Sequence, residues 1–114
     1  MGSDDEISQN FISPGAAILD DLQYKFKDII FVIAGTNKTN NQTFIGSPAD
    51  SINSLVVNSV DYMDNISSYS RRGPVLSFYK KPDVSCFGGD INKRICISVS
   101  EGDTFSYGTS FATP

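Results

Sequence analysis

The first regular element that the sequence predicts is a helix over residues 14–27. Pro14 suits the first turn of a helix, and Ser13 before it can act as the N-cap. Apolar residues then recur at steps of one, four and four, which places them on one stripe of that helix. We expect this stripe to face the core, with charged residues toward water. Its members are Ala17, Ile18, Leu22 and Phe26.

A continuous apolar run at residues 29–34 follows the helix almost at once. Its β-branched and aromatic composition is typical of a strand that is covered on both faces. A helix that feeds such a strand through a short turn is half of a βαβ unit, so we predict an α/β fold with a mostly parallel sheet. Further extended segments are predicted at residues 54–60, 81–84 and 94–99, with turns at 88–90 and 101–103.

Composition and charge narrow the class of protein. The 114 residues, 39% of them hydrophobic, fit one packed domain or part of one. The net charge is −4 and the basic residues are scattered, which argues against nucleic-acid binding. No apolar run is long enough to cross a membrane. The first six residues are polar and acidic, unlike a secretory signal, and favour a cytoplasmic location, although Met1–Ser3 are equally consistent with an expression tag.

Two residue types decide which chemistry is open to the chain. Cys86 and Cys96 can form a disulfide or remain as reduced thiols in or near the core, and we favour the thiols. There is no histidine and no CxxC, so we predict no zinc site, no other metal and no cofactor. Histidine is the usual general base at neutral pH. A hydrolase of the Ser–His–Asp type therefore cannot be complete within this sequence.

The segment that carries chemistry is GTSFATP at residues 108–114. Glycine allows a tight turn and the close approach of a substrate carbonyl. A serine at the start of a helix lies among free N–H groups, and its own N–H can donate to an oxyanion. The small Ala112 allows that helix to pack closely. A turn with an N-capping Ser or Thr explains the same letters without any catalysis.

The order of several landmarks favours the catalytic interpretation. The motif resembles the serine motif of the subtilases, usually Gly-Thr-Ser-Met-Ala followed by a small residue and Pro. Upstream landmarks resemble those of the same family in the same order. They are the apolar run ending at Asn37, the Pro-Ala pair at 48–49, the Val-rich run ending at Asp61, SRRGP at 70–74 and KPDV at 81–84 followed by GGD. The resemblance covers about residues 15–114.

The resemblance implies a subtilisin-like three-layer α/β sandwich and a role for each matching residue. Ser110 matches the nucleophile, and Asn37 matches the side-chain donor of the oxyanion hole. The family usually has Ala-Gly-Asn where this chain has Ala-Gly-Thr-Asn, so Thr36 is the donor if the alignment shifts. The implied substrate is a polypeptide, and the family's substrate-binding positions correspond to Ala34, Gly35, Thr36, Gly108 and Thr109. Thr36 would narrow the specificity pocket.

The contexts of the family's triad Asp and His are absent here, and Asp61 and Asp83 are more simply explained as structural. We therefore expect residues 1–12 to be a disordered lead-in or tag remnant, and residues 13–114 to be a partial peptidase domain truncated just after the nucleophile motif. The isolated chain is expected to be inactive. The alternative to a protease fragment is a degenerate subtilase that acts as a binding or assembly module or has no function. Exposed sheet edges favour a homo-oligomer.

Overall fold

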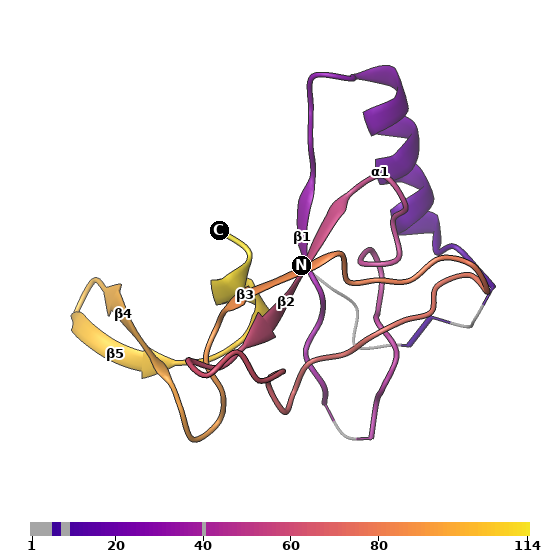
Figure 1. Cartoon of the computed structure of the whole chain (residues 1–114). Coiled ribbons are helices and arrows are strands. Elements are labelled where there is room, and N and C mark those ends of the chain that lie inside the picture. The colour runs from indigo at the N-terminus through magenta and orange to yellow at the C-terminus, as the bar shows by residue number, and fades with distance from the viewer. Residues whose placement is uncertain (1–5, 8–9, 40) are drawn as a thin grey trace.

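The computed structural model describes residues 6–7, 10–39 and 41–114. Three parallel strands form one sheet in the order β1-β2-β3, and β4 and β5 form a separate antiparallel hairpin (Figure 1). The mixed helix and strand content with a parallel sheet confirms the predicted α/β class. The elements are α1 (Pro14–Lys25), β1 (Val32–Ala34), β2 (Leu55–Val60), β3 (Val84–Phe87), β4 (Ile95–Val99), β5 (Gly102–Ser106) and α2 (Thr109–Ala112).

Helix α1 begins where the sequence predicts. The Ser13 hydroxyl caps it by accepting from the N–H of Ala16 at 3.2 Å, and Asp50 in turn accepts from the N–H and hydroxyl of Ser13. The helix ends at Lys25, two residues early. The predicted buried stripe is wrong, because Ile18 is 61% exposed. The body contacts the helix on another side, where Ala16 is the residue that is buried.

Strand β1 is shorter than the apolar run that predicted it. Ile30 is 73% exposed and Val32 46% exposed, so the expectation of a strand covered on both faces is wrong. Successive side chains of a strand point to opposite faces, and Ile33 is buried while Val32 is exposed, so only one face of β1 is covered. The strand pairs only with β2, with Ile33 opposite Val56. Strand β2 is central, and the prediction of a buried strand there is confirmed.

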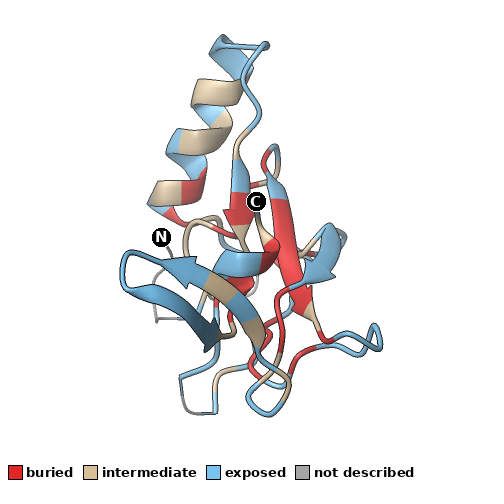
Figure 2. Cartoon of the chain, turned by 90° about the vertical axis from the view of Figure 1, so that its left-hand side faces the viewer, coloured by how far each residue is buried: buried red, intermediate tan, exposed pale blue. Residues whose placement is uncertain are grey.

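The core lies beside the β1-β2 part of the sheet. Figure 2 shows burial concentrated along β2 and nearby loops, while the hairpin is largely exposed. Other apolar residues pack against this core from the edge of α1 and from loops. The buried cluster consists of Ile33, Ile45, Ala49, Val56 and Val75.

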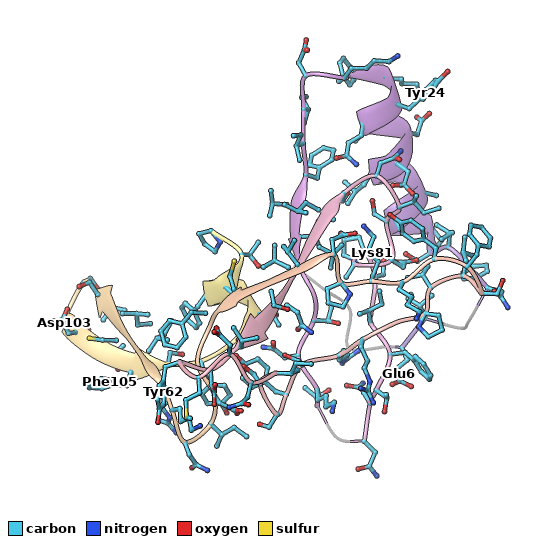
Figure 3. The ribbon with its side chains drawn as sticks, in the orientation of Figure 1. Glu6, Tyr24, Tyr62, Lys81, Asp103 and Phe105 are labelled. Carbon is cyan, nitrogen blue, oxygen red and sulfur yellow. The ribbon has the colours of Figure 1, made fainter. Side chains whose placement is uncertain are left out.

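A buried cation stabilises the entry to β3. Lys81 donates to Asp83 at 2.6 Å and to the carbonyl of Ser54 at 2.7 Å, and Figure 3 shows it within the body of the molecule. Asp83 also accepts from the N–H of Val56 at 2.7 Å. The structural interpretation of Asp83 is therefore confirmed.

The β4-β5 hairpin leads directly into α2. The strand expected at residues 94–99 is confirmed as β4, but its partner β5 was not predicted. Phe105 is 65% exposed on this hairpin (Figure 3). Cys96 on β4 and Cys86 on β3 are free thiols, but both are exposed rather than in the core. Every residue of β3, β4 and β5 is exposed or half-buried, so neither thiol reaches the core.

Part of the expected lead-in contacts the body. The N–H of Ile7 donates to Ile45, and that of Asn10 donates to Val75. Glu6 accepts from two backbone N–H groups. The expectation of a disordered lead-in over residues 1–12 stays a prediction, and residues 1–5 and 8–9 of it lie outside the described residues. No helix in the described part of the chain is long and apolar enough to span a membrane.

Candidate active site

The motif at the end of the chain adopts the local structure that its glycine and serine predict. Gly108 has φ +154°, a conformation that favours glycine, and α2 begins at the next residue. Ser110 is the second residue of α2 and is exposed. The small Ala112 is buried on the opposite side, as expected for a helix that packs closely.

The loop at residues 107–108, called the serine loop, packs against Gly88. The N–H of Gly108 donates to the carbonyl of Gly88 at 3.1 Å. A Cβ on Gly88 would lie 2.4 Å from the Ser59 hydroxyl, 2.7 Å from the Gly108 carbonyl and 3.0 Å from the Ala112 Cβ. Only glycine fits at this position. Because the packing is so close, it determines the distance between the serine loop and the sheet.

Asn37 is brought to the serine motif from 72 residues away in the sequence. Its Oδ1 accepts from the N–H of Thr109 at 3.1 Å and from the Thr109 hydroxyl at 2.8 Å. Because a backbone N–H can only donate, this contact fixes which amide atom is the oxygen. The Nδ2 donor then makes no hydrogen bond within the part of the chain that the structure describes, and it lies near Gly108. It is free to donate to a ligand.

The backbone of Asn37 is held as firmly as its side chain. Arg71 is fully buried, and its Nε donates to the Asn37 carbonyl at 2.8 Å. Asn37 also forms an isolated β-bridge with Ser70. These contacts place the amide without using its Nδ2, and the sequence pattern gave no sign of the role of Arg71.

Thr36 has a different environment. Its φ is +58°, a conformation that L-residues with branched Cβ atoms rarely adopt. The hydroxyl donates to the Gly35 carbonyl at 2.8 Å and accepts from the N–H of Gly46 at 3.1 Å. With both contacts made and only 7% of the residue exposed, the hydroxyl is turned into the protein and away from a ligand.

A cavity of about 720 Å³ adjoins the serine. Of the predicted substrate-binding positions, Ala34 shares its lining with Ser110. Gly35 and Thr36 are buried instead. Gly108 and Thr109, which directly precede Ser110 in the chain, are buried as well. The lining is mainly apolar and consists of Val32, Ile33, Ala34, Pro48, Ser110, Thr113 and Pro114.

A buried hydroxyl network supports the loop from below, and sequence reasoning missed it. The Tyr69 hydroxyl lies 2.6 Å from that of Ser59 and 2.9 Å from the Gly89 carbonyl. The Ser67 hydroxyl donates to the same carbonyl at 2.7 Å. The ring of Tyr69 packs against Tyr107, with centroids 5.2 Å apart. The paired glycines and the serines were visible in the sequence, but their convergence was not.

Asp61 is structural, as the sequence indicated. Its carboxylate accepts from Lys93 at 2.6 Å and from the N–H groups of Met63 and Asn65. The Lys93 ammonium is the main cause that lowers the pKa of Asp61 well below its ordinary value. In the described residues no cluster of three or more His, Cys, Asp or Glu side chains could hold a metal ion.

Comparison with known proteins places this geometry in a family. The sequence pattern that describes the subtilase family matches residues 2–114. The chain belongs to the subtilase family. The resemblance drawn from the Ser110 motif is thereby confirmed, and with it the assignment to the serine proteases as a family.

A solved structure shares the fold of this subtilase chain. The prenylagaramide maturation protease PagA superposes with a TM-score of 0.70 at 18% sequence identity, over 98% of this chain and 37% of PagA. The chain thus spans little more than a third of that structure. At this identity the similarity shows the fold alone.

Proposed function

We propose that this chain supplies the nucleophile and part of the oxyanion hole of a serine endopeptidase. The observation that carries the proposal is the bond from Thr109 to Asn37 Oδ1, which leaves the Nδ2 donor available beside the serine loop. Ser110 is exposed and lines an adjacent cavity of about 720 Å³. Nucleophile, donor and space for an acyl group therefore lie together.

The proposed reaction is acyl transfer. The Ser110 Oγ attacks the carbonyl carbon of a peptide bond while its proton passes to a base. The carbonyl oxygen becomes an oxyanion, which Asn37 Nδ2 stabilises together with the serine's own N–H. The C–N bond then breaks, the proton passes to the leaving amine, and water hydrolyses the Ser110 ester.

The base has to come from outside this sequence. The chain has no histidine, and the carboxylates of Asp61 and Asp83 are already held by lysines. We therefore expect the isolated chain to be inactive and the complete enzyme to require a proton acceptor and its orienting acid from further polypeptide. Thr36, with its hydroxyl engaged, is not part of this proposal as a donor.

Fluorophosphonate labelling tests the proposal, with mass spectrometry to locate the adduct. In the longest native form of the protein we expect an adduct on Ser110 that is absent from the Ser110→Ala variant. A folded full-length form without any adduct would refute an active site. It would favour the alternative of a degenerate subtilase that serves in binding or assembly.

We also propose that the isolated chain self-associates. Apolar side chains are exposed on α1 and at the β1 edge, including Ile18, Phe26, Ile30 and Val32. Open strand edges and apolar faces favour pairing between copies. Sedimentation is expected to show a species larger than 12.4 kDa, and a stable monomer would contradict this.

A further inference from the structure

A second, polar pocket is lined by residues that lie next to Asn37 in the chain or contact its backbone. Its volume is about 290 Å³, and its lining includes Lys38, Asn58, Ser70, Arg71 and Arg72. Lys38 follows Asn37 in the chain, and Ser70 is its partner in the β-bridge. The pocket is therefore built on the same two segments that position the candidate oxyanion donor, and the proposed function leaves it unused.

The rim of this pocket carries uncompensated positive charge. The side chains of Lys38 and Arg72 are exposed and make no ion pair or hydrogen bond within the described ranges. Arg71 behind them is fully buried. The pKa of Glu6 is lowered first by the backbone N–H of Phe44 and also by the charge of Arg71, which thus already acts within the protein. The charge that the rim offers to a ligand is therefore that of Lys38 and Arg72. Charges of one sign lining a recess concentrate the opposite charge there.

Two carboxylates on neighbouring segments already have partners. Asp90 accepts from the N–H and hydroxyl of Ser68, at 2.8 and 2.6 Å. Glu6 accepts from the backbone N–H groups of Thr43 and Phe44. Neither acid is paired with Lys38 or Arg72, so the two exposed cations remain available for an anion from outside.

The floor of the pocket contains an unsatisfied acceptor. Asn58 is 4% exposed, and its Nδ2 donates to the Arg71 carbonyl at 3.2 Å. Its Oδ1 is buried and has no hydrogen-bond partner in the described structure. That oxygen lies inside the protein, 3.6 Å from where a Cβ on Gly35 would be, so the polar lining that a ligand meets is supplied by the other residues of the pocket.

We propose that this pocket binds an acidic side chain of the polypeptide substrate, near the bond that is cleaved. The proposal rests on the proposed function for the identity of its ligand as a substrate. The carboxylate pairs with Lys38 and Arg72. An extended peptide whose carbonyl contacts Asn37 presents a neighbouring side chain to this surface. The subtilase chain therefore selects glutamate or aspartate close to the reacting residue.

A binding experiment in the Ser110→Ala background tests this without turnover. The ¹⁵N-labelled longest native form carrying Ser110→Ala is titrated with acetyl-AAEAA-amide and acetyl-AAQAA-amide, which differ only in a carboxylate against an amide. Two exposed charge pairs favour the Glu peptide by about fivefold in Kd at low salt. Shifts are expected at Lys38 and residues 66–72. The preference is expected to shrink as salt is raised, because these charges are exposed.

Matched variants assign the preference to the pocket. Lys38→Gln with Arg72→Gln is expected to remove it. Lys27→Gln with Lys80→Gln removes the same net charge from exposed sites elsewhere and is expected to retain it. Equal affinity for the two peptides, or loss of the preference in both double variants, would overturn the proposal. So would equal binding of an acid-free peptide with a free C-terminus, which would mean that the pocket binds a chain terminus.

The outcome is separable from that of the proposed function. Ser110 labelling in the native form together with equal peptide affinities refutes the acidic pocket and leaves the endopeptidase standing. A pocket-dependent Glu preference without any Ser110 labelling refutes catalysis and leaves a module that binds acidic peptides.

Discussion

Adding one methyl group at Gly88 is expected to displace the serine loop and to destabilise the fold. The new Cβ would lie 2.4 Å from the Ser59 hydroxyl and 2.7 Å from the Gly108 carbonyl. Neither atom moves easily. The Ser59 hydroxyl belongs to the Tyr69 network, and the Gly108 carbonyl accepts from Phe111 in the first turn of α2. Gly88→Ala therefore has to displace the backbone on which Ser110 stands.

The magnitude follows from two contributions. Forcing an extra methyl group into a packed site costs about 1 to 3 kcal/mol. Lengthening the bond from the Gly108 N–H to the Gly88 carbonyl costs about 1 kcal/mol more. We expect Gly88→Ala to lower the free energy of unfolding by about 3 kcal/mol. Divided by a urea m-value of about 1 to 3 kcal/mol/M, that lowers the urea midpoint by roughly 1 to 3 M.

Urea unfolding followed by circular dichroism measures this effect. Ser85→Ala, at an exposed position on β3, serves as the control and is expected to change stability by less than about 0.5 kcal/mol. Labelling of Ser110 in the native form is expected to fall in Gly88→Ala as well. A midpoint equal to that of the control would show that the loop accommodates the methyl group, and our account of Gly88 as the support of the serine loop would be wrong.

Three further outcomes are expected. Asn37→Asp keeps an oxygen for Thr109 but removes the Nδ2 donor. Labelling of Ser110 in the native form should therefore slow by about 10²- to 10³-fold, while the urea midpoint changes little. An unchanged labelling rate would exclude Asn37 as the oxyanion donor. Because its pKa is depressed mainly by Lys93, Asp61 stabilises the fold above its unfolded pKa of about 4, and this contribution is lost as pH falls toward the folded pKa. Urea midpoints measured from pH 6 to pH 3 should therefore fall more steeply for the wild type than for Asp61→Asn, and parallel curves would contradict the assignment. Lys81→Met removes the ammonium that donates to Asp83 and to the Ser54 carbonyl, and thermal unfolding should show a loss of about 3 kcal/mol, against under about 0.5 kcal/mol for the exposed Lys80→Met.

The sequence by itself determined the features that depend on local residue order. The N-cap at Ser13, the α/β class, the strand at 54–60 and the tight turn before Ser110 all follow from short-range patterns, because caps, strand propensity and glycine turns are decided within a few residues. The serine motif and its ordered landmarks were enough to indicate the subtilase family. They also identified Asn37 and Ser110 as the candidate oxyanion donor and the candidate nucleophile.

Only the tertiary structure decided which side chains are buried and which distant residues come into contact. The stripe on α1 and the run at 29–34 carry the pattern of buried elements, yet Ile18 and Ile30 are exposed, since burial depends on which other segments pack there. The meeting of Asn37 with Thr109, the role of Gly88 beneath the loop and the unpaired Oδ1 of Asn58 join residues far apart in the chain. Such contacts depend on how the parallel strands bring their loops together at one edge of the sheet. The pattern of residues along the chain does not encode the distances between those loops.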